Sequence, residues 1–134
     1  MTGVGAWLDA LDSAPLECDG MTRVISTLLQ RDGLPHRVVV GRLEVAGYGV
    51  IPLHWWIELP DGRICDLRAR MWLGGGETIP HGLALPTDRQ RYCITEELVR
   101  SSVQLPGVVF ELLVGKPLQA FAKVGELSSP SAVN

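Results

Sequence analysis

Apolar side chains recur at helical spacing in the first quarter of the chain. They fall at the i, i+3, i+4 and i+7 positions of one helical face: Cys18, Met21, Val24, Ile25, Leu28 and Leu29. Pro15 is tolerated in the first turn of a helix, whereas Gly33 and Pro35 prevent its continuation. We therefore predict an amphipathic helix from about Leu16 to Asp32, bearing Cys18 at its start.

Runs rich in β-branched and aromatic residues follow this helix. We predict strands at His36–Val45, Leu53–Leu59 and Arg63–Arg70. Glycines and Pro52 break the pattern between the first two runs, and Pro60, Asp61 and Gly62 form a turn between the last two. A short helix over Trp7–Leu11 precedes them. This order predicts an α+β fold in which the helix bearing Cys18 packs on a small antiparallel sheet.

The second half of the chain has weaker patterns. Glycines 74–76 indicate a loop, and Glu77–Gln90 reads as irregular. Thr95, followed by two glutamates, is typical of an N-cap, which predicts a short helix ending near Ser102. The apolar run Val108–Val114 fits either a strand or a buried helix. We expect one domain over residues 1–124 and a disordered tail over 125–134.

Composition and charge exclude several classes of protein. The chain has 134 residues, 46% of them hydrophobic and 20% charged, which is a globular balance and not a disordered one. The formal charge is -3, and no basic run suggests nucleic-acid binding. No apolar stretch has the roughly 20 residues that a membrane helix needs. Since no secretory signal is evident either, we expect a soluble cytoplasmic protein without a cofactor.

The three cysteines are the main chemical question. Their odd number and the absence of a C-x-x-C pair argue against disulfides and zinc ribbons. Cys18 lies at a predicted helix start, where unpaired backbone N–H groups and the helix dipole favour a thiolate. The same N–H groups can receive the oxyanion that forms when a thiolate attacks a carbonyl. Cys65 and Cys93 fit inert core thiols.

A thiol nucleophile needs a base and a group that orients the base, and His54 and Asp66 are the candidates. Strand residues alternate between faces, so the turn between the two strands decides whether these side chains can meet. A two-residue turn would place them on opposite faces. A three-residue loop made of Pro60, Asp61 and Gly62 pairs Trp56 with Asp66 and puts both beside His54. Proline, aspartate and glycine suit the three positions of that loop, so we predict the second register.

These motifs resemble a known family. C-D-G-M-T at a helix start, then H-W-W-I-E-L on a strand and D-L after a hairpin, are similar to the transglutaminase-like branch of the papain-like cysteine enzymes. The short chain is also similar to the leader peptidases of lasso-peptide biosynthesis. The resemblance spans Leu16 to Leu67. It departs from the family at the bulky Trp55 and in lacking an upstream amide side chain as oxyanion donor.

The resemblance implies a role for each residue of the site. Cys18 would be the nucleophile, His54 the general base and then acid, and Asp66 the orienting partner. Trp56 and Asp19 would support the packing or the oxyanion site, and Trp7 is a candidate second donor. The implied activity is a cysteine-dependent hydrolase that cleaves a peptide or amide bond through a thioester. Glutamine deamidation and acyl transfer on a protein substrate share that first step.

Other interpretations stay open at this point. One is a non-catalytic module that binds a partner protein through Val108–Val114, and another is a zinc site with Cys18, His54 and Asp66 as ligands. His36 fits a surface turn, and His81 fits a surface loop or the wall of a cleft. Glu58 and Arg68 fit an exposed ion pair.

Overall fold

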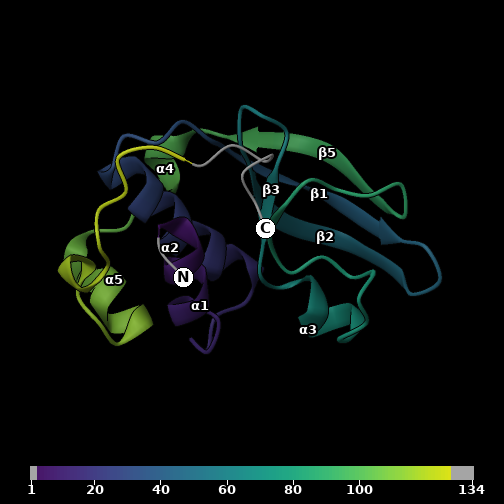
Figure 1. Cartoon of the computed structure of the whole chain (residues 1–134), viewed down its shortest axis with the longest axis horizontal. Helices are drawn as coiled ribbons and strands as arrows, with labels where there is room; N and C mark the ends of the chain where they lie inside the picture. Colours follow the sequence, from purple (N-terminus) through teal and green to yellow (C-terminus); the bar gives the residue numbers. More distant parts are fainter. Residues whose placement is uncertain (1–2, 128–134) are drawn as a thin grey trace.

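The structure, a computed structural model, describes residues 3–127. It is an α+β fold in which N-terminal helices pack on a five-stranded antiparallel sheet. The helices α1 (Val4–Leu11) and α2 (Cys18–Arg31) gather on one side of the molecule with the C-terminal helices, and the strands occupy the other side (Figure 1). The α+β class predicted from the sequence is confirmed.

Helix α2 forms because its apolar stripe is buried. Val24 and Leu28 are completely buried, and the stripe packs against α1 and against one face of the sheet. The helix begins at Cys18 and not at Leu16, since Glu17 adopts an extended conformation and its carbonyl accepts the first helical bond, from Met21. The predicted helix is therefore confirmed, and Cys18 is its first residue.

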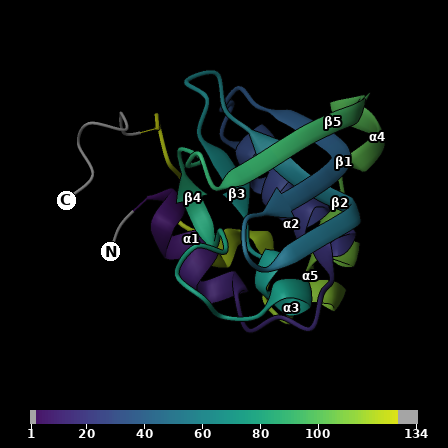
Figure 2. The ribbon, with the colours of Figure 1, turned by 90° about the vertical axis from the view of Figure 1, so that its right-hand side faces the viewer.

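The sheet has the order β4-β3-β2-β1-β5 with antiparallel neighbours throughout. Figure 2 shows β5, β1 and β2 running side by side in front of the helices. The strands are β1 (Arg37–Val45), β2 (Gly49–Glu58), β3 (Ile64–Asp66), β4 (Gly82–Ala84) and β5 (Gln90–Leu98).

Strand β2 is longer than the sequence pattern predicts, because Pro52 does not end it. The register between β1 and β2 shifts between Gly41 and Leu43, so that Pro52 and Leu53 lie opposite the single residue Arg42. This is a β-bulge, and a proline is tolerated there because the bulge leaves a backbone group out of the ladder.

The predicted third strand, Arg63–Arg70, is wrong beyond Asp66. Its chain leaves the sheet and enters α3 (Ala69–Leu73), because the Asp66 carboxylate accepts hydrogen bonds from the backbone N–H groups of Arg68 and Ala69. These bonds favour a helix start over further ladder bonds. The segment 77–90, predicted to be irregular, contains the short strand β4, which pairs with β3.

The helix predicted to start at Thr95 is also wrong. Thr95 lies inside β5, which pairs along nearly its whole length with β1, and its hydroxyl donates to the carbonyl of Val40. Pairing with a central strand outweighs the local capping signal. The helix in this region, α4 (Arg100–Val103), begins only after β5 has ended.

The apolar run near the C-terminus is a helix, α5 (Gly107–Val114), followed by a 3-10 turn, η1 (Leu118–Ala120). Phe110 anchors it in the core through an edge-to-face contact with Phe121. Val108 and Leu112 remain exposed. Most of the predicted tail, from residue 128 onward, lies outside the described residues, while Leu127 packs against the main core.

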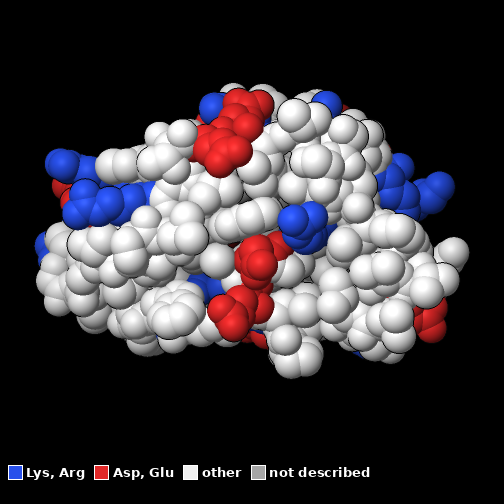
Figure 3. Space-filling model, turned by 180° about the vertical axis from the view of Figure 1, so that it is seen from behind, with Lys and Arg blue, Asp and Glu red and all other residues white. Residues whose placement is uncertain are grey.

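No helix within residues 3–127 is both long enough and apolar enough to span a membrane. Figure 3 shows one face of the molecule, on which lysines and arginines are scattered singly or in small groups. No continuous basic patch crosses this face, in keeping with the net charge of -3.

Candidate active site

The hairpin between β2 and β3 has the register that its turn residues predict. The Gly62 N–H donates to the Leu59 carbonyl at 3.0 Å, which closes a type I turn over Pro60 and Asp61. Leu59 then pairs with Arg63, and Ile57 pairs with Cys65. Gly62 has φ of 91°, a left-handed conformation that costs glycine little. The three-residue loop therefore brings Trp56 opposite Asp66.

His54 and Asp66 meet in the interior as this register requires. The His54 Nε2–H donates to Asp66 Oδ2 over 2.8 Å. The His54 side chain is completely buried, and that of Asp66 is 1% exposed. A buried carboxylate needs hydrogen bonds to stay ionised. Asp66 has four of them, because Oδ1 accepts the backbone bonds that start α3 and Oδ2 accepts from a second side chain besides His54.

That second side chain is Tyr92, a residue the sequence analysis did not single out. Its hydroxyl donates to Asp66 Oδ2 at 2.9 Å, and burial next to this carboxylate raises the pKa of Tyr92, so the phenol stays protonated. Tyr92 lies on β5, three strand positions from β3. In a flat sheet that separation would be roughly 14 Å. The sheet therefore curls so that β5 reaches over β3, which no local sequence signal reveals.

Cys18 approaches the imidazole from the start of α2, where it is half-buried. Burial alone lowers the pKa of His54, but the hydrogen bond to Asp66, together with the proximity and negative charge of Asp66 and Cys18, raises it to about 9. Because His54 Nε2 is hydrogen-bonded to Asp66, Nδ1 is the ring nitrogen that can interact with the Cys18 thiol. An imidazole with this pKa is protonated at neutral pH, and an imidazolium stabilises a neighbouring thiolate.

Two buried side-chain nitrogens here, His54 Nδ1 and Trp56 Nε1, have no hydrogen-bond partner among the described residues. The Cys18 thiol is thus close to His54 without an aligned hydrogen bond, as is common in unliganded catalytic sites. Trp56 is completely buried, with its ring between those of His54 and Tyr92. Orphaned polar groups are rare in ordinary cores, which makes this cluster a candidate functional site.

Of the groups expected to support an oxyanion, the side chains of Trp7 and Asp19 are engaged elsewhere. Trp7 is not a donor to this site, since its indole N–H donates to the carbonyl of Ala122 at 2.7 Å. The Asp19 side chain is exposed and accepts a hydrogen bond from the N–H of Gly20. Glu17 provides no side-chain cap for α2. The Gly20 N–H is thus engaged by Asp19, and the backbone N–H groups of Cys18 and Asp19 at the start of α2 are the ones available beside the sulfur.

The other sulfur and imidazole groups have different surroundings. Burial raises the pKa of the Cys65 thiol to about 12, so it stays protonated, and Cys93 is half-buried on β5. His36 is not on the surface as predicted. It is buried, donates from Nδ1 to the Leu34 carbonyl and contacts the Ser26 hydroxyl at 2.7 Å, and burial lowers its pKa. His81 lines two clefts and contacts Asp12.

The predicted pair of Glu58 and Arg68 does not form. Glu58 accepts from Arg37 at 2.7 Å, while Arg68 is buried and its guanidinium binds residues of the loop between α1 and α2. The sequence signal was misleading because Arg68 lies past the end of β3, where the strand alternation of faces no longer applies.

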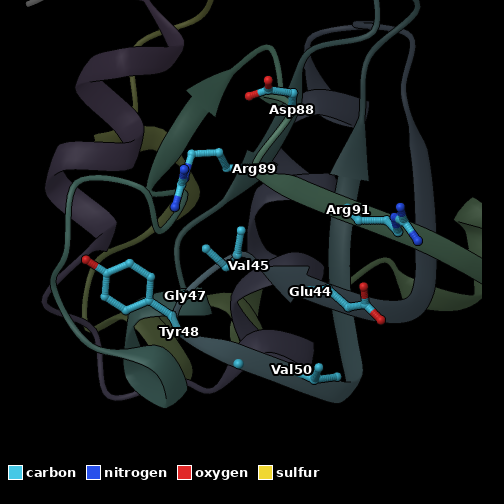
Figure 4. Close-up of a pocket in the computed structure, with 10 residues that line it drawn as sticks. Glu44, Val45, Gly47, Tyr48, Val50, Asp88, Arg89 and Arg91 are labelled. Atoms are coloured by element: carbon cyan, nitrogen blue, oxygen red, sulfur yellow. The ribbon is translucent and has the colours of Figure 1, made fainter.

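Within the described part of the chain, the candidate residues belong neither to a metal-binding cluster nor to the hollow beside the β1–β2 turn. In residues 3–127, no cluster of three or more histidine, cysteine or acidic side chains has an arrangement that could hold a metal ion. A hollow of about 540 Å³ lies at the turn joining β1 to β2. Figure 4 shows Tyr48, Arg89 and the other residues that line it, none of which is a cysteine or histidine. Cys18, His54 and Asp66 therefore remain the candidate site.

Comparisons of this protein with models of known families, with curated proteins and with solved structures find no match.

Proposed function

We propose that this protein is a cysteine-dependent hydrolase that cleaves a peptide or amide bond through a thioester on Cys18. The observation that carries the proposal is the bridging position of His54, which donates from Nε2 to Asp66 and leaves Nδ1 for the thiol at the start of α2. A residue that needed only to fill the core would not combine complete burial, a raised pKa and an unpartnered nitrogen.

The reaction begins with the thiolate of Cys18. Its sulfur attacks the carbonyl carbon, and the backbone N–H groups at the start of α2 stabilise the oxyanion. His54 Nδ1 gives its proton to the departing nitrogen as the C–N bond breaks, which leaves an acyl thioester. Neutral His54 then takes a proton from water, whose oxygen attacks the thioester, and the acid and the thiolate separate. Asp66 keeps the imidazole oriented and stabilises its charged form.

A groove beside the site gives a substrate room to bind. It has a volume of about 360 Å³ and is lined partly by apolar residues, including Pro15, Leu16, Leu67 and Met71. Pro15 and Leu16 precede Cys18 closely in the chain, and Leu67 follows Asp66. The groove therefore borders the segments that carry the nucleophile and the carboxylate. This arrangement suits an extended peptide better than a compact metabolite.

The likeness to the transglutaminase-like branch of the papain-like enzymes agrees with this proposal. It is based on the order of the cysteine helix, the histidine strand and the aspartate after a hairpin, which the fold preserves. Deamidation of glutamine and acyl transfer to an amine use the same thioester. They differ from hydrolysis of a peptide bond only in the leaving group and the acceptor.

Alkylation by iodoacetamide tests the activated thiol. We expect Cys18 to react rapidly at pH 6, where an ordinary thiol is almost entirely protonated. Peptide mass spectrometry gives the rates at Cys18 and Cys93 in the same molecule, so half-buried Cys93 is an internal control. Equal and slow rates at both residues would remove the basis for thioester chemistry.

A peptide library then identifies the reaction. Wild-type protein should generate new N-termini that the Cys18→Ala variant does not. A mass increase of about 1 Da at glutamine would indicate deamidation, and incorporation of a labelled amine would indicate acyl transfer. No change of any kind in a protein whose Cys18 is reactive would mean that the substrate requires a context absent from the library.

A binding module is the second candidate, and one observation favours it. Val108 and Leu112 are 73% and 79% exposed and lie four residues apart, so they share one face of α5. An apolar face of this kind fits contact with a partner protein. A Cys18→Ala variant that retains every biological effect of the protein would favour this function over hydrolysis.

A further inference from the structure

The guanidinium of Arg68 binds the loop that leads to Cys18. Nε donates to the Leu16 carbonyl at 2.6 Å, and one terminal nitrogen donates to the carbonyls of Asp12 and Ala14 at 2.9 and 3.0 Å. The other terminal nitrogen donates to Asp12 Oδ1 at 3.0 Å and to the Leu67 carbonyl at 2.8 Å. Arginine has five N–H donors, and these bonds use all of them.

From these contacts we propose that Arg68 is a positioning residue, which holds the Cys18 sulfur in place against His54. The inference depends on the proposed thioester chemistry at Cys18. It adds to that chemistry a residue that does not touch the reacting atoms and acts through the backbone that precedes the nucleophile, while its side chain also lines the groove described above.

Arg68 restrains the chain that leads into Cys18. Leu16 precedes Cys18 by two residues, so their Cα atoms are at most about 7 Å apart. Holding the Leu16 carbonyl therefore restricts where α2 begins. Glu17 supplies no side-chain cap, so the start of α2 has no such anchor of its own. Arg68, which is 6% exposed, provides the anchor from another part of the fold.

Arg68 also contacts Asp66, the carboxylate of the site. The backbone N–H of Arg68 donates to Asp66 Oδ1, the carboxylate that binds His54 through its second oxygen. One residue thus contacts the orienting carboxylate with its main chain and the loop before the nucleophile with its side chain. The sulfur and the carboxylate come from distant parts of the sequence, and Arg68 connects the two segments that carry them.

The spread of the acceptors around the side chain requires an arginine. The acceptors are spread around a planar fork, and a lysine ammonium is a single point that cannot reach them together. The bond to the Leu16 carbonyl is buried and those to the Asp12 and Ala14 carbonyls are partly buried, so losing the fork leaves these groups without their partner. The loop would then shift. A displacement of about 1 Å of a catalytic group can slow a reaction by up to about a hundredfold.

The experiment compares the pH profile of Cys18 alkylation in Arg68→Lys and in wild-type protein, well below the melting temperature of each. We expect the rate at pH 6 to fall at least about tenfold in Arg68→Lys, while Cys93 reacts as before. Arg63→Lys is the matched control, since Arg63 is also buried but binds Asp61 within the hairpin turn. It should lower the melting temperature without changing the Cys18 profile.

Chemical rescue separates positioning from general stability. Methylguanidinium should restore part of the low-pH rate in Arg68→Ala and should have no effect on Arg63→Ala. If Arg68→Ala does not fold, Asp12→Ala removes part of the same contact, and we expect it to slow Cys18 alkylation severalfold. His81→Ala, which removes only the imidazole contact with Asp12, should not slow it.

The outcomes distinguish this inference from the function on which it rests. Folded Arg68 variants whose Cys18 profile equals that of wild-type protein would overturn the positioning role and leave the hydrolase intact. A wild-type protein without rapid alkylation at pH 6 would contradict the proposed function itself.

Discussion

At the scale of single residues, the site depends on how the two nitrogens of His54 are shared. Nε2 is fixed by Asp66, whose remaining lone pairs are occupied by Tyr92 and by the start of α3. Asp66 is therefore an orienting group that cannot easily move.

Replacement of His54 by alanine should slow alkylation of Cys18 at pH 6 and move the midpoint of its pH profile upward. The reason is that the imidazolium stabilises the thiolate by its charge. The same profile measured at Cys93 should be unchanged. A Cys18 profile that is identical in the variant and in wild-type protein would show that the two groups do not interact.

Replacement of Tyr92 by phenylalanine should reduce the free energy of unfolding by about 1.5 kcal/mol, because a hydrogen bond to a buried carboxylate is lost. Tyr48→Phe is the matched control, since that side chain is half exposed and its replacement should have little effect. Urea denaturation measures the free energy of unfolding of both variants. Equal stability of the two variants would contradict the role assigned to the Tyr92 hydroxyl.

At the scale of elements, close contacts between neighbouring strands place the site. The β2–β3 hairpin sets the register that joins His54 to Asp66, and β5 brings Tyr92 over them. Gly41 on β1 pairs with His54, and its backbone approaches both β5 and the ring of Trp56. Glycine is needed at two positions here for different reasons, a backbone angle at Gly62 and a lack of space at Gly41.

Gly62→Ala should lower the free energy of unfolding by about 1 kcal/mol, since the left-handed backbone is unfavourable for a residue with a Cβ. The added atom would meet only Leu85 at an ordinary distance of 3.7 Å, so the cost comes from the backbone and not from crowding. Gly107→Ala, at the open first position of α5, should be neutral or slightly stabilising. Thermal melts of both variants check this.

Gly41→Ala should be more destabilising, by about 2 kcal/mol or more, because a Cβ would collide with the Cys93 carbonyl oxygen and lie 2.9 Å from the Trp56 ring. The neighbouring atoms belong to a paired strand and a buried indole, neither of which can move freely. Gly75→Ala is the control, as its loop position is open. A Gly41→Ala variant as stable as this control would mean that β5 can shift without cost.

At the scale of the whole molecule, two buried histidines make stability depend on pH in opposite directions. His54 has a pKa of about 9, above the ordinary 6.5, so the folded state binds its proton more tightly than the unfolded state does. His36 has a lowered pKa, because burial disfavours its charged form. The fold therefore stabilises the charged form of His54 and the neutral form of His36.

The stabilising effect of His54 should be complete below pH 6.5 and disappear as the pH rises through about 9. The effect of His36 should weaken as the pH falls below 6.5. We therefore expect stability to be greatest near neutral pH and to decline on both sides. Melting temperatures from pH 5 to 10 test this, and His54→Gln should flatten the alkaline side. Parallel curves for the variant and wild-type protein would contradict the assignment.

The sequence by itself determined the features that depend on neighbouring residues. The apolar stripe places Cys18 at a helix start, and Pro60, Asp61 and Gly62 define a turn whose length brings Asp66 to the face of His54. Periodicity and turn geometry act within a few residues, so they can be read locally. This is why the α+β class and the three candidate catalytic residues were predictable.

Only the tertiary structure decided the features that depend on distant partners. Thr95 lies in a strand because β1 pairs with the residues on both sides of it, and β3 ends early because Asp66 starts a helix. Tyr92 reaches Asp66 because the sheet curls, and Arg68 binds a loop more than fifty residues earlier in the chain. These contacts arise when segments pack together, and packing outweighs a local preference of less than about 1 kcal/mol per residue.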